Sequence, residues 1–186
     1  FHREAIAFDQ RTGITYMTED REDGLFYRHV PDSPQNPFVA GKLQALAVSG
    51  SSNFELSNAE RKLGERFSIT WVDIPDRDAM KVTTRLQGKE RGCATVNRAE
   101  GAIYQNGSVL FTSTDGGPVG QGQIFRLDIG GVEEYLTIIS QAERYTDYQH
   151  PDNLTVTPWG EVLIAEDGVA PNHIRLLKSD GRVLNL

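Results

Sequence analysis

One pattern recurs three times along the chain and constrains its fold more than any other feature. It consists of an acidic residue, a short apolar strand, a tight turn with glycine, a second short strand and another acidic residue. The strand pairs are 4–8 with 14–18, 100–104 with 108–114, and 152–156 with 161–165. The turns suit hairpins, because glycine and asparagine, as in Asn106-Gly107, adopt positive φ at low cost.

A further apolar segment follows each copy, at 24–28, 123–127 and 174–177. Three or four antiparallel strands, repeated about every 50 residues, are typical of β-propeller blades. The sequence therefore predicts an all-β fold made of such blades. Between the first two copies we expect strands at 43–48 and 67–72, a polar surface loop at 49–65, and a helix over 77–87 that Asp76 caps and Gly88 stops.

No shift in composition marks a second domain, so residues 1–186 are expected to form part of one propeller domain. The chain starts with Phe1 rather than Met, and its pattern is already under way there. Three blades do not close a ring, and an open ring leaves blade faces and sheet edges unburied. We therefore expect a partial ring, with further blades ahead of Phe1.

Composition excludes several other classes of protein. Lys and Arg number 19 against 26 Asp and Glu, a net charge of −7, whereas nucleic-acid binding calls for clustered basic charge. No apolar run approaches the roughly 18 residues of a membrane-spanning helix. The single cysteine, Cys93, excludes an internal disulfide and a cysteine-based zinc cluster.

Acidic residues stand at the same place in each copy. Glu4, Glu100 and Asp152 precede or open the first strand of their repeats. In a propeller the innermost strands begin at one mouth of the central channel, so these three carboxylates are expected to face a common point. Converging carboxylates repel one another, and a hard cation such as Ca²⁺ would relieve that repulsion.

A basic residue stands two positions before each of these acids: His2, Arg98 and His150. Side chains two apart on a strand share a face, so an anionic ligand such as phosphate is a candidate for this mouth. The same acids are also consistent with ordinary solvated strand ends. A second recurring set, Asp20, Asp115 and Asp167, is equally consistent with ordinary turns; Glu100 and Asp115 are 15 positions apart, as are Asp152 and Asp167.

Several segments together resemble the PhoX-type alkaline phosphatases. They are Arg-Glu-Ala-Ile-Ala-Phe-Asp at 3–9, Thr-Glu-Asp at 18–20, Arg-Ala-Glu-Gly at 98–101, Phe-Thr-Ser-Thr-Asp-Gly-Gly at 111–117, Gly-Gln-Ile-Phe at 122–125, Pro-Asp-Asn-Leu-Thr-Val-Thr-Pro at 151–158 and Ala-Glu-Asp-Gly at 165–168. The resemblance runs over nearly the whole chain and is weakest between 32 and 65.

This resemblance implies a six-bladed propeller with a calcium–iron cluster in its channel that binds phosphate monoesters. It implies that Glu4 and Glu100 are metal ligands, that Asp152 lies near the cluster, that Asp20 ligates calcium and that Arg98 contacts the phosphate. The family's iron-binding cysteine belongs to a Thr-Cys-Glu-Glu segment, which this chain lacks, so Cys93 is not expected to take that role. The resemblance also implies export to the periplasm or the medium.

The leading hypothesis is therefore part of a calcium- and iron-dependent phosphomonoesterase, with small phosphate esters as substrates, no protein nucleophile and no activity of this piece alone. A calcium-dependent lactonase of the propeller type is the first alternative. A lactonase would give no role to the basic residues His2, Arg98 and His150. A non-catalytic propeller that binds a ligand is the second alternative, and it predicts no tightly bound metal.

Overall fold

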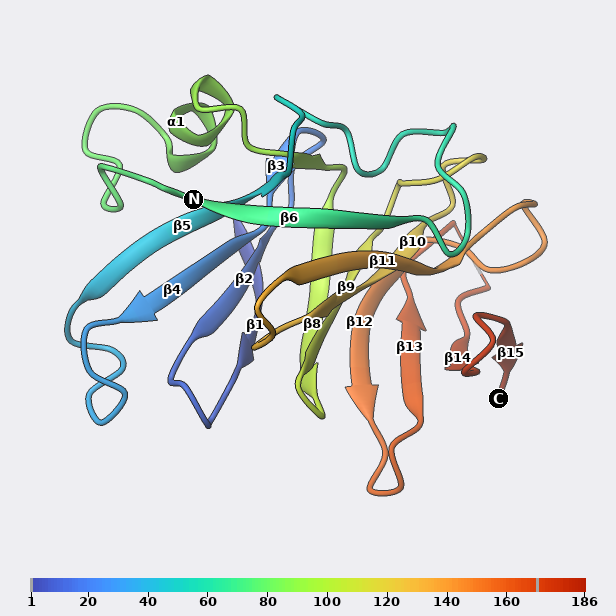
Figure 1. The fold of residues 1–186 in the computed structure, drawn as a ribbon. Coiled ribbons are helices and arrows are strands. Elements are labelled where there is room, and N and C mark those ends of the chain that lie inside the picture. Colours follow the sequence, from blue (N-terminus) through green and yellow to red (C-terminus); the bar gives the residue numbers. More distant parts are fainter. Residues whose placement is uncertain (1, 170) are drawn as a thin grey trace.

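The computed structural model describes residues 2–169 and 171–186, and it consists of three antiparallel strand groups that correspond to the three repeats (Figure 1). Blade 1 contains β1 (Arg3–Phe8), β2 (Thr15–Glu19), β4 (Tyr27–Pro31) and β5 (Gly41–Val48). Blade 2 contains β8 (Ala99–Gln105), β9 (Ser108–Ser113), β10 (Gln123–Asp128) and β11 (Glu134–Gln141). Blade 3 contains β12 (Pro151–Val156), β13 (Val162–Glu166), β14 (Ile174–Leu177) and β15 (Val183–Asn185).

The first two blades share one continuous sheet. β6 (Arg66–Asp73) pairs with β5 on one side and with β11 on the other, which gives the nine-stranded order β1-β2-β4-β5-β6-β11-β10-β9-β8. Blade 3 is a separate sheet of four strands. A third, two-stranded sheet pairs β3 (Gly24–Leu25) with β7 (Thr95–Val96) beside the single described helix, α1 (Thr84–Glu90).

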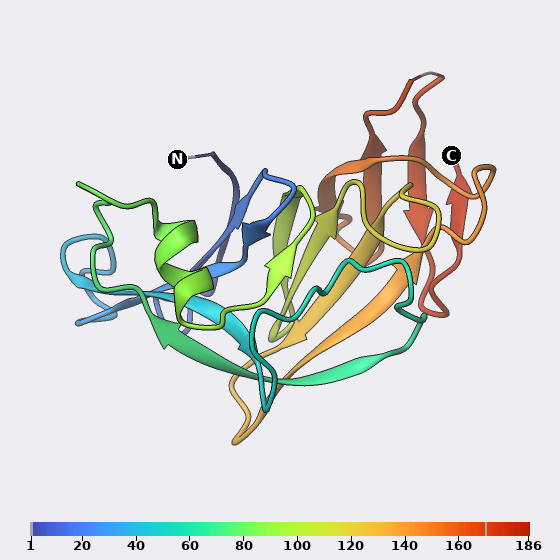
Figure 2. The same ribbon diagram turned by 90° about the horizontal axis from the view of Figure 1, so that it is seen from above.

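The three innermost strands, β1, β8 and β12, lie next to one another, with β8 in the middle. They run from the upper to the lower side of the molecule in Figure 1, so their first residues gather at one end. The view from above shows that α1, β3, β7 and the loop at 49–65 lie to one side of the inner strands (Figure 2). The fold is thus all-β and of the propeller type, as predicted.

Apolar residues of neighbouring blades pack against each other. Between blades 1 and 2, the rings of Phe26 and Phe111 stack with their centres 4.2 Å apart, and Phe125 continues the stack 5.1 Å from Phe111. Between blades 2 and 3, Leu110 and Ile124 pack with four residues of blade 3, Leu154, Val162, Ile164 and Leu177. Stacked aromatic rings and buried aliphatic side chains are the main source of stability in such a core.

The structure departs from the expected elements in several strands and in the helix, and β7 and β15 have no counterpart among the expected strands. The expected strand at 24–28 is divided, because Gly24 and Leu25 pair with β7 whereas Tyr27 pairs with β2 and β5. β11 was not predicted, although its buried Leu136 and Ile138 alternate as in a half-buried strand. The loop at 49–65 contains no strand, as expected.

The predicted helix over 77–87 was wrong at both ends. Asp76 accepts the amide hydrogen of Met80 within a turn, while the α1 cap is Thr83, whose hydroxyl accepts the amide hydrogen of Leu86. Gly88 lies inside the helix rather than after it. A Cβ at Gly88 would lie 2.4 Å from Cδ1 of Leu25, so this glycine serves close packing and does not end the helix.

Gly101 lets blade 3 approach blade 2. A Cβ at this position would lie 2.6 Å from the carbonyl oxygen of Asp152 and 2.8 Å from Cα of Asn153, both in the β12 backbone. Its counterpart after Glu4 in β1 is Ala5, so the strand itself accepts alanine.

We therefore expect Gly101→Ala to lower the free energy of unfolding by about 1–3 kcal/mol, the usual cost of overpacking. Urea denaturation measures this as a lower midpoint. Ala5→Gly is the matched control and is expected to cost no more than about 1 kcal/mol. Equal midpoints for Gly101→Ala and the unsubstituted protein would show that β8 and β12 separate at little cost.

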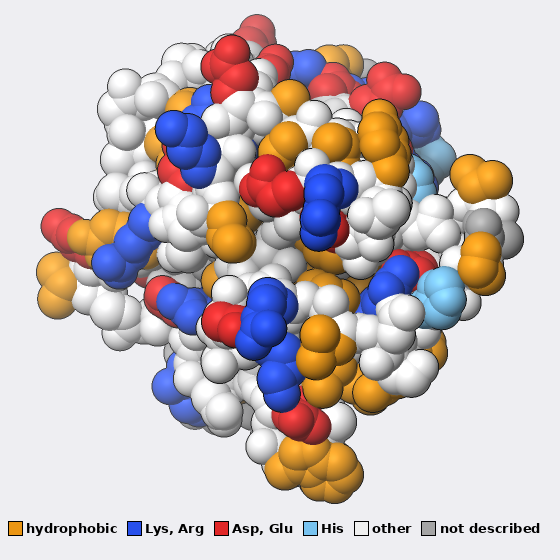
Figure 3. Space-filling model, turned by 90° about the vertical axis from the view of Figure 1, so that its right-hand side faces the viewer, with side chains coloured by type: hydrophobic (Ala, Val, Ile, Leu, Met, Phe, Trp, Pro, Cys, Tyr) orange, Lys and Arg blue, Asp and Glu red, His pale blue; other side chains and the backbone are white. Residues whose placement is uncertain are grey.

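The outer face of blade 3 carries charged and apolar side chains that are interspersed (Figure 3). Its exposed apolar residues include Ile174, Leu184 and Leu186. No helix in the described part of the chain is long and apolar enough to cross a membrane.

Candidate functional site

The three inner strands share one irregularity, and it lies at the predicted acids. In each hairpin the inner strand has one more residue than its partner between two paired positions: between Arg3 and Ile6, between Ala99 and Ala102, and between Pro151 and Asn153. Glu4, Glu100 and Asp152 lie in these bulges. A β-bulge redirects the side chain that it contains, and such bulges are frequent next to active sites.

Hydrogen bonds between blades place two of these acids. Thr18 in β2 donates its hydroxyl hydrogen to the carbonyl oxygen of Glu100 at 2.6 Å, and Thr112 in β9 donates to the carbonyl oxygen of Asp152 at 3.4 Å. Both threonines are fully buried and stand at equivalent positions of their blades. Blade 1 therefore fixes the backbone at the acid of blade 2, and blade 2 fixes the backbone at the acid of blade 3.

Two of the three basic residues two positions earlier adopt a backbone conformation that is uncommon for residues other than glycine. Arg98 has φ 47° and His150 has φ 43°, so both are in the left-handed region. The carbonyl oxygens of Arg98 and His150 accept the amide hydrogens of Thr114 and Asp167, and the equivalent bond runs from Asp20 to His2. Non-glycine residues held in this region cluster at functional sites, where the surrounding structure stabilises the strain.

Arg98 is the centre of an ionic cluster. Its guanidinium donates to both carboxylate oxygens of Asp20, with distances of 2.9 Å from Nε and 3.3 Å from Nη2. Nη2 also donates to Oε1 of Glu100 at 2.5 Å, and Nη1 lies 3.5 Å from Asp115. The Asp20 hydrogen bond is the main reason that the pKa of Arg98 is raised above its usual value. This arginine is held firmly and stays charged.

Glu100 and Asp152 form a pair of adjacent carboxyl groups. Glu100 is buried, whereas Asp152 is half-buried. Burial raises the pKa of Glu100 to about 8, and the hydrogen bond and negative charge of Asp152 add to the rise, which the charge of Arg98 opposes. A proton shared by the pair, or a cation in addition to Arg98, would therefore relieve the remaining repulsion.

Asp115 connects the two basic residues. Its Oδ1 is 2.8 Å from Nδ1 of His150, and its Oδ2 is the atom that faces Arg98. In each blade, the residue just before the recurring acid pairs with Glu19, Ser113 or Glu166 of the second strand. The residues that follow these partners, Asp20, Thr114 and Asp167, are therefore equivalent, and Asp115 lies one position further along. The equal spacing of 15 positions was thus misleading for Asp115.

Glu19 and Glu166, the residues just before Asp20 and Asp167, were not singled out from the sequence. Glu19 and Glu166 are buried and serve the fold. Glu19 accepts hydrogen bonds from the amide of Leu25 and, at 2.8 Å, from the hydroxyl of Tyr27. Glu166 accepts bonds from two backbone amides and from Arg175. Both residues end an apolar strand one position before a turn, and this position could have marked them in the sequence as buried structural glutamates.

The structure brings together four of the five predicted site residues: Asp20, Arg98, Glu100 and Asp152. Glu4 is exposed, and no side-chain hydrogen bond or ion pair joins it to another residue in the described part of the chain. Its backbone is nonetheless close to the cluster, because Thr18, which bonds to Glu100, also accepts the amide hydrogen of Ala5 at 2.9 Å. The predicted convergence is thus seen for Glu100 and Asp152, and Glu4 lies at the same end.

The carboxyl pair fits a hard cation in kind, since Ca²⁺ prefers oxygen ligands and a positive charge would relieve the repulsion between Glu100 and Asp152. It does not form a complete site, because no three His, Cys, Asp or Glu side chains within 2–169 and 171–186 are arranged to hold a metal. Cys93 does not contribute: it is buried beside Leu25 and Ile74, and burial raises the pKa of its thiol to about 11.

Comparison with known proteins gives a consistent result. The family model described as "Alkaline phosphatase PhoX" matches residues 1–186. The solved structure of Pseudomonas fluorescens PhoX in complex with vanadate, a transition state analogue, is similar in fold, with a TM-score of 0.75 at 15% sequence identity. The match covers 98% of this chain and 43% of that one. No curated protein matches the sequence.

Proposed function

Because the chain belongs to the PhoX family of alkaline phosphatases, we propose that it forms part of a phosphatase that hydrolyses phosphate monoesters at the Arg98 cluster. The observation that carries this proposal is a guanidinium held by Asp20 and Glu100 at the end of the molecule where the inner strands begin. A preoriented arginine suits a phosphoryl group, since its planar fork bonds two oxygens at once.

In the proposed reaction the bond between phosphorus and the alcohol oxygen breaks, and a bond from phosphorus to a water oxygen forms. Arg98 binds the phosphoryl oxygens and stabilises the charge that develops on them. Its Nη1 is the nitrogen most easily redirected, because the contact of Nη1 with Asp115 is longer than the shortest contacts of Nε and Nη2. Asp20 is a positioning residue, which keeps the guanidinium pointing toward Glu100.

We propose that Glu100 and Asp152 bind calcium, with Glu4 and Asp20 as further candidate ligands. A bound divalent or trivalent cation would polarise the phosphoryl group and orient the attacking oxygen. The family resemblance adds iron to this proposal, although the described residues offer no thiolate for it. Export to the periplasm or the medium is part of the same proposal.

The test is hydrolysis of p-nitrophenyl phosphate by the full-length gene product, with and without a calcium chelator. We expect turnover that the chelator abolishes and that inorganic phosphate inhibits. Arg98→Ala is expected to raise KM and the inhibition constant of phosphate by about 10–100-fold, the value of a charged hydrogen-bonded pair. Arg98→Lys should recover part of the lost phosphate affinity, because lysine keeps the positive charge but lacks the planar guanidinium that bonds two oxygens at once.

Other outcomes would redirect the assignment. A metal-loaded protein that hydrolyses lactones but not phosphate esters, and that phosphate does not inhibit, would favour a lactonase. A protein without bound metal or turnover would favour a binding propeller. If phosphate inhibition is unchanged in Arg98→Ala, phosphate does not bind at this arginine.

A further inference from the structure

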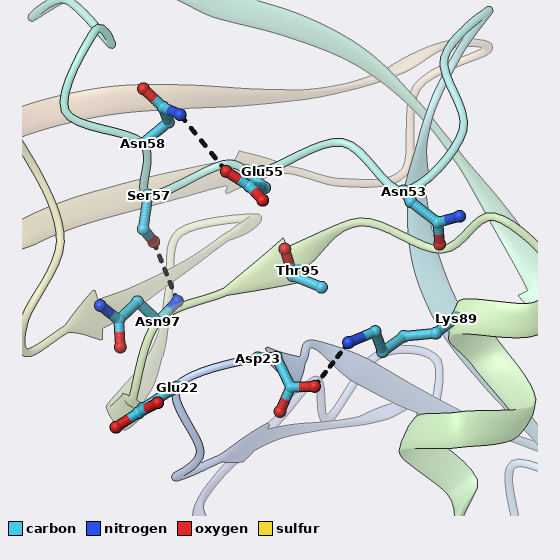
Figure 4. A pocket seen from close by; sticks show the side chains of 9 residues that line it. All are labelled: Glu22, Asp23, Asn53, Glu55, Ser57, Asn58, Lys89, Thr95 and Asn97. Carbon is cyan, nitrogen blue, oxygen red and sulfur yellow. Dashed lines mark hydrogen bonds and ion pairs between the residues drawn. The ribbon is translucent and has the colours of Figure 1, made fainter.

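A polar pocket of about 390 Å³ is lined in part by Asn97, the residue that directly precedes Arg98 (Figure 4). Its walls come from the turn after β2, the loop at 53–58, α1 and the segment that enters β8. All nine lining side chains are polar: Glu22, Asp23, Asn53, Glu55, Ser57, Asn58, Lys89, Thr95 and Asn97. The volume is within the range of small-molecule sites, but those sites are usually lined by apolar side chains. This pocket therefore suits a hydrophilic ligand.

The backbone connects this pocket to the cluster directly. The amide of Asn97 donates to Ser57 Oγ at 3.1 Å within the wall, and its side chain donates to the carbonyl oxygen of Asp115 at 3.3 Å. The next residue, Arg98, donates its amide hydrogen to the carbonyl oxygen of Arg21 at 2.8 Å, next to Glu22 in the opposite wall. One segment thus supplies both the pocket wall and the arginine.

The walls are also fixed before any ligand arrives. The loop at 53–58 is bonded to the segment at 92–95 through Asn53, Thr95 and Leu56, with N–O distances of 2.9–3.0 Å. Lys89 of α1 reaches across to Asp23 at 2.5 Å. A preformed pocket loses less free energy in ordering on binding than a mobile one does.

The charges in the pocket select among hydrophilic ligands. Asp23 is neutralised by Lys89 and Arg85, which leaves Glu22 and Glu55 as carboxylates without a basic partner among the lining residues. Carboxylates accept hydrogen bonds from hydroxyl groups and repel a second anion. The amides of Asn53, Asn58 and Asn97 add both donors and acceptors of the kind that hydroxyl groups pair with.

We propose that this pocket binds the alcohol portion of the substrate and selects hydroxylated, uncharged alcohols of the polyol or sugar type over anionic ones. The inference rests on the proposed phosphatase function and specifies the substrate class at that same site. The phosphate would lie at Arg98, and the hydroxyl groups would extend toward Glu55 and Asn58.

The test compares glycerol 3-phosphate with 3-phosphoglycerate. The two substrates differ only at one end, where the first has a hydroxymethyl group and the second has a carboxylate. In the metal-loaded full-length protein, kcat/KM is expected to be about tenfold higher for glycerol 3-phosphate. Glu22→Gln with Glu55→Gln should reduce that ratio to about threefold or less, because the repulsion of the anion is gone.

Glu60→Gln is the matched control, since Glu60 is an exposed acid of the same loop that does not line the pocket. A ratio near one in the unsubstituted protein, or an unchanged ratio in the double variant, would overturn the pocket inference while leaving the phosphatase intact. If no phosphate ester is hydrolysed, the proposed function fails instead. Ligand-observed NMR with glycerol then tests the pocket alone: binding that Glu22→Gln/Glu55→Gln weakens supports it, and absence of binding rejects it.

Discussion

Glu100→Gln is expected to lower kcat/KM for phosphate esters by at least about a hundredfold in the full-length, metal-loaded protein, which is the upper range for losing a residue that supports a metal centre. Glutamine has the same shape but no charge. The substitution removes the carboxylate that contacts Arg98 at 2.5 Å and adjoins Asp152. Both the arginine's orientation and the affinity for calcium should suffer.

Three measurements separate these causes. Elemental analysis reports the metal content, steady-state kinetics report kcat and KM, and thermal unfolding reports whether the fold is intact. With the metal removed, stability should be nearly unchanged, because glutamine keeps an acceptor oxygen and removes the repulsion with Asp152. Glu133→Gln, at the distant hairpin between β10 and β11, is the control. Normal turnover and metal content in Glu100→Gln would remove this residue from the site.

Glu166→Gln is expected to destabilise the protein by about 3–5 kcal/mol, the usual cost of breaking a buried ion pair. The Glu166 side chain is 0% exposed and Nε of Arg175 lies 2.7 Å from it, so the substitution leaves the arginine without its anion. The amides of Gln149 and His173 lose a charged acceptor at the same time. Urea denaturation should show a much lower midpoint, whereas exposed Glu90→Gln should change the free energy of unfolding by less than about 0.5 kcal/mol.

The pH dependence of this loss has a definite sign. Burial alone would raise the pKa of Glu166, but Arg175 and the two amides lower it below the ordinary 4.5. A carboxyl group whose pKa is lower in the folded state contributes its full stability above its unfolded pKa and loses it as the pH falls through the folded value. The difference between the unsubstituted protein and Glu166→Gln should therefore be largest at neutral pH and should shrink below about pH 4.5. A difference that does not change with pH would contradict this ionic role.

The sequence predicted the parts of the fold that repeat. Hairpins around Asn106-Gly107 and the two other glycine turns, and the register of Glu4, Glu100 and Asp152, follow from local turn chemistry and were confirmed. The β5–β6 connection between blades was not predicted, because it depends on which sheet edges meet rather than on local pattern. The predicted end of the helix was wrong for a similar reason, because Gly88 is required for close packing against Leu25 in another element and does not end the helix.

The site was predictable in outline only. The recurring acid with a basic residue two positions earlier pointed to Arg98 and Glu100, whose side chains the structure brings into contact; their roles stay a prediction. The explanation given for it, a shared strand face, was wrong, because Arg98 and His150 are in the left-handed region and the acids lie in bulges. Spacing alone also could not distinguish the buried structural Glu166 from its exposed neighbour Asp167.

The shared sheet also determines how the molecule comes apart. Blades 1 and 2 form one continuous hydrogen-bonded sheet through β5, β6 and β11, so we expect them to unfold as a single cooperative unit. Blade 3 is a separate sheet that joins them through side-chain packing and a few hydrogen bonds. Glu100 and Asp152 thus belong to different cooperative units. We expect a partial opening that detaches blade 3 to separate the two carboxyl groups while most of the secondary structure persists, so the candidate site would be lost before the fold.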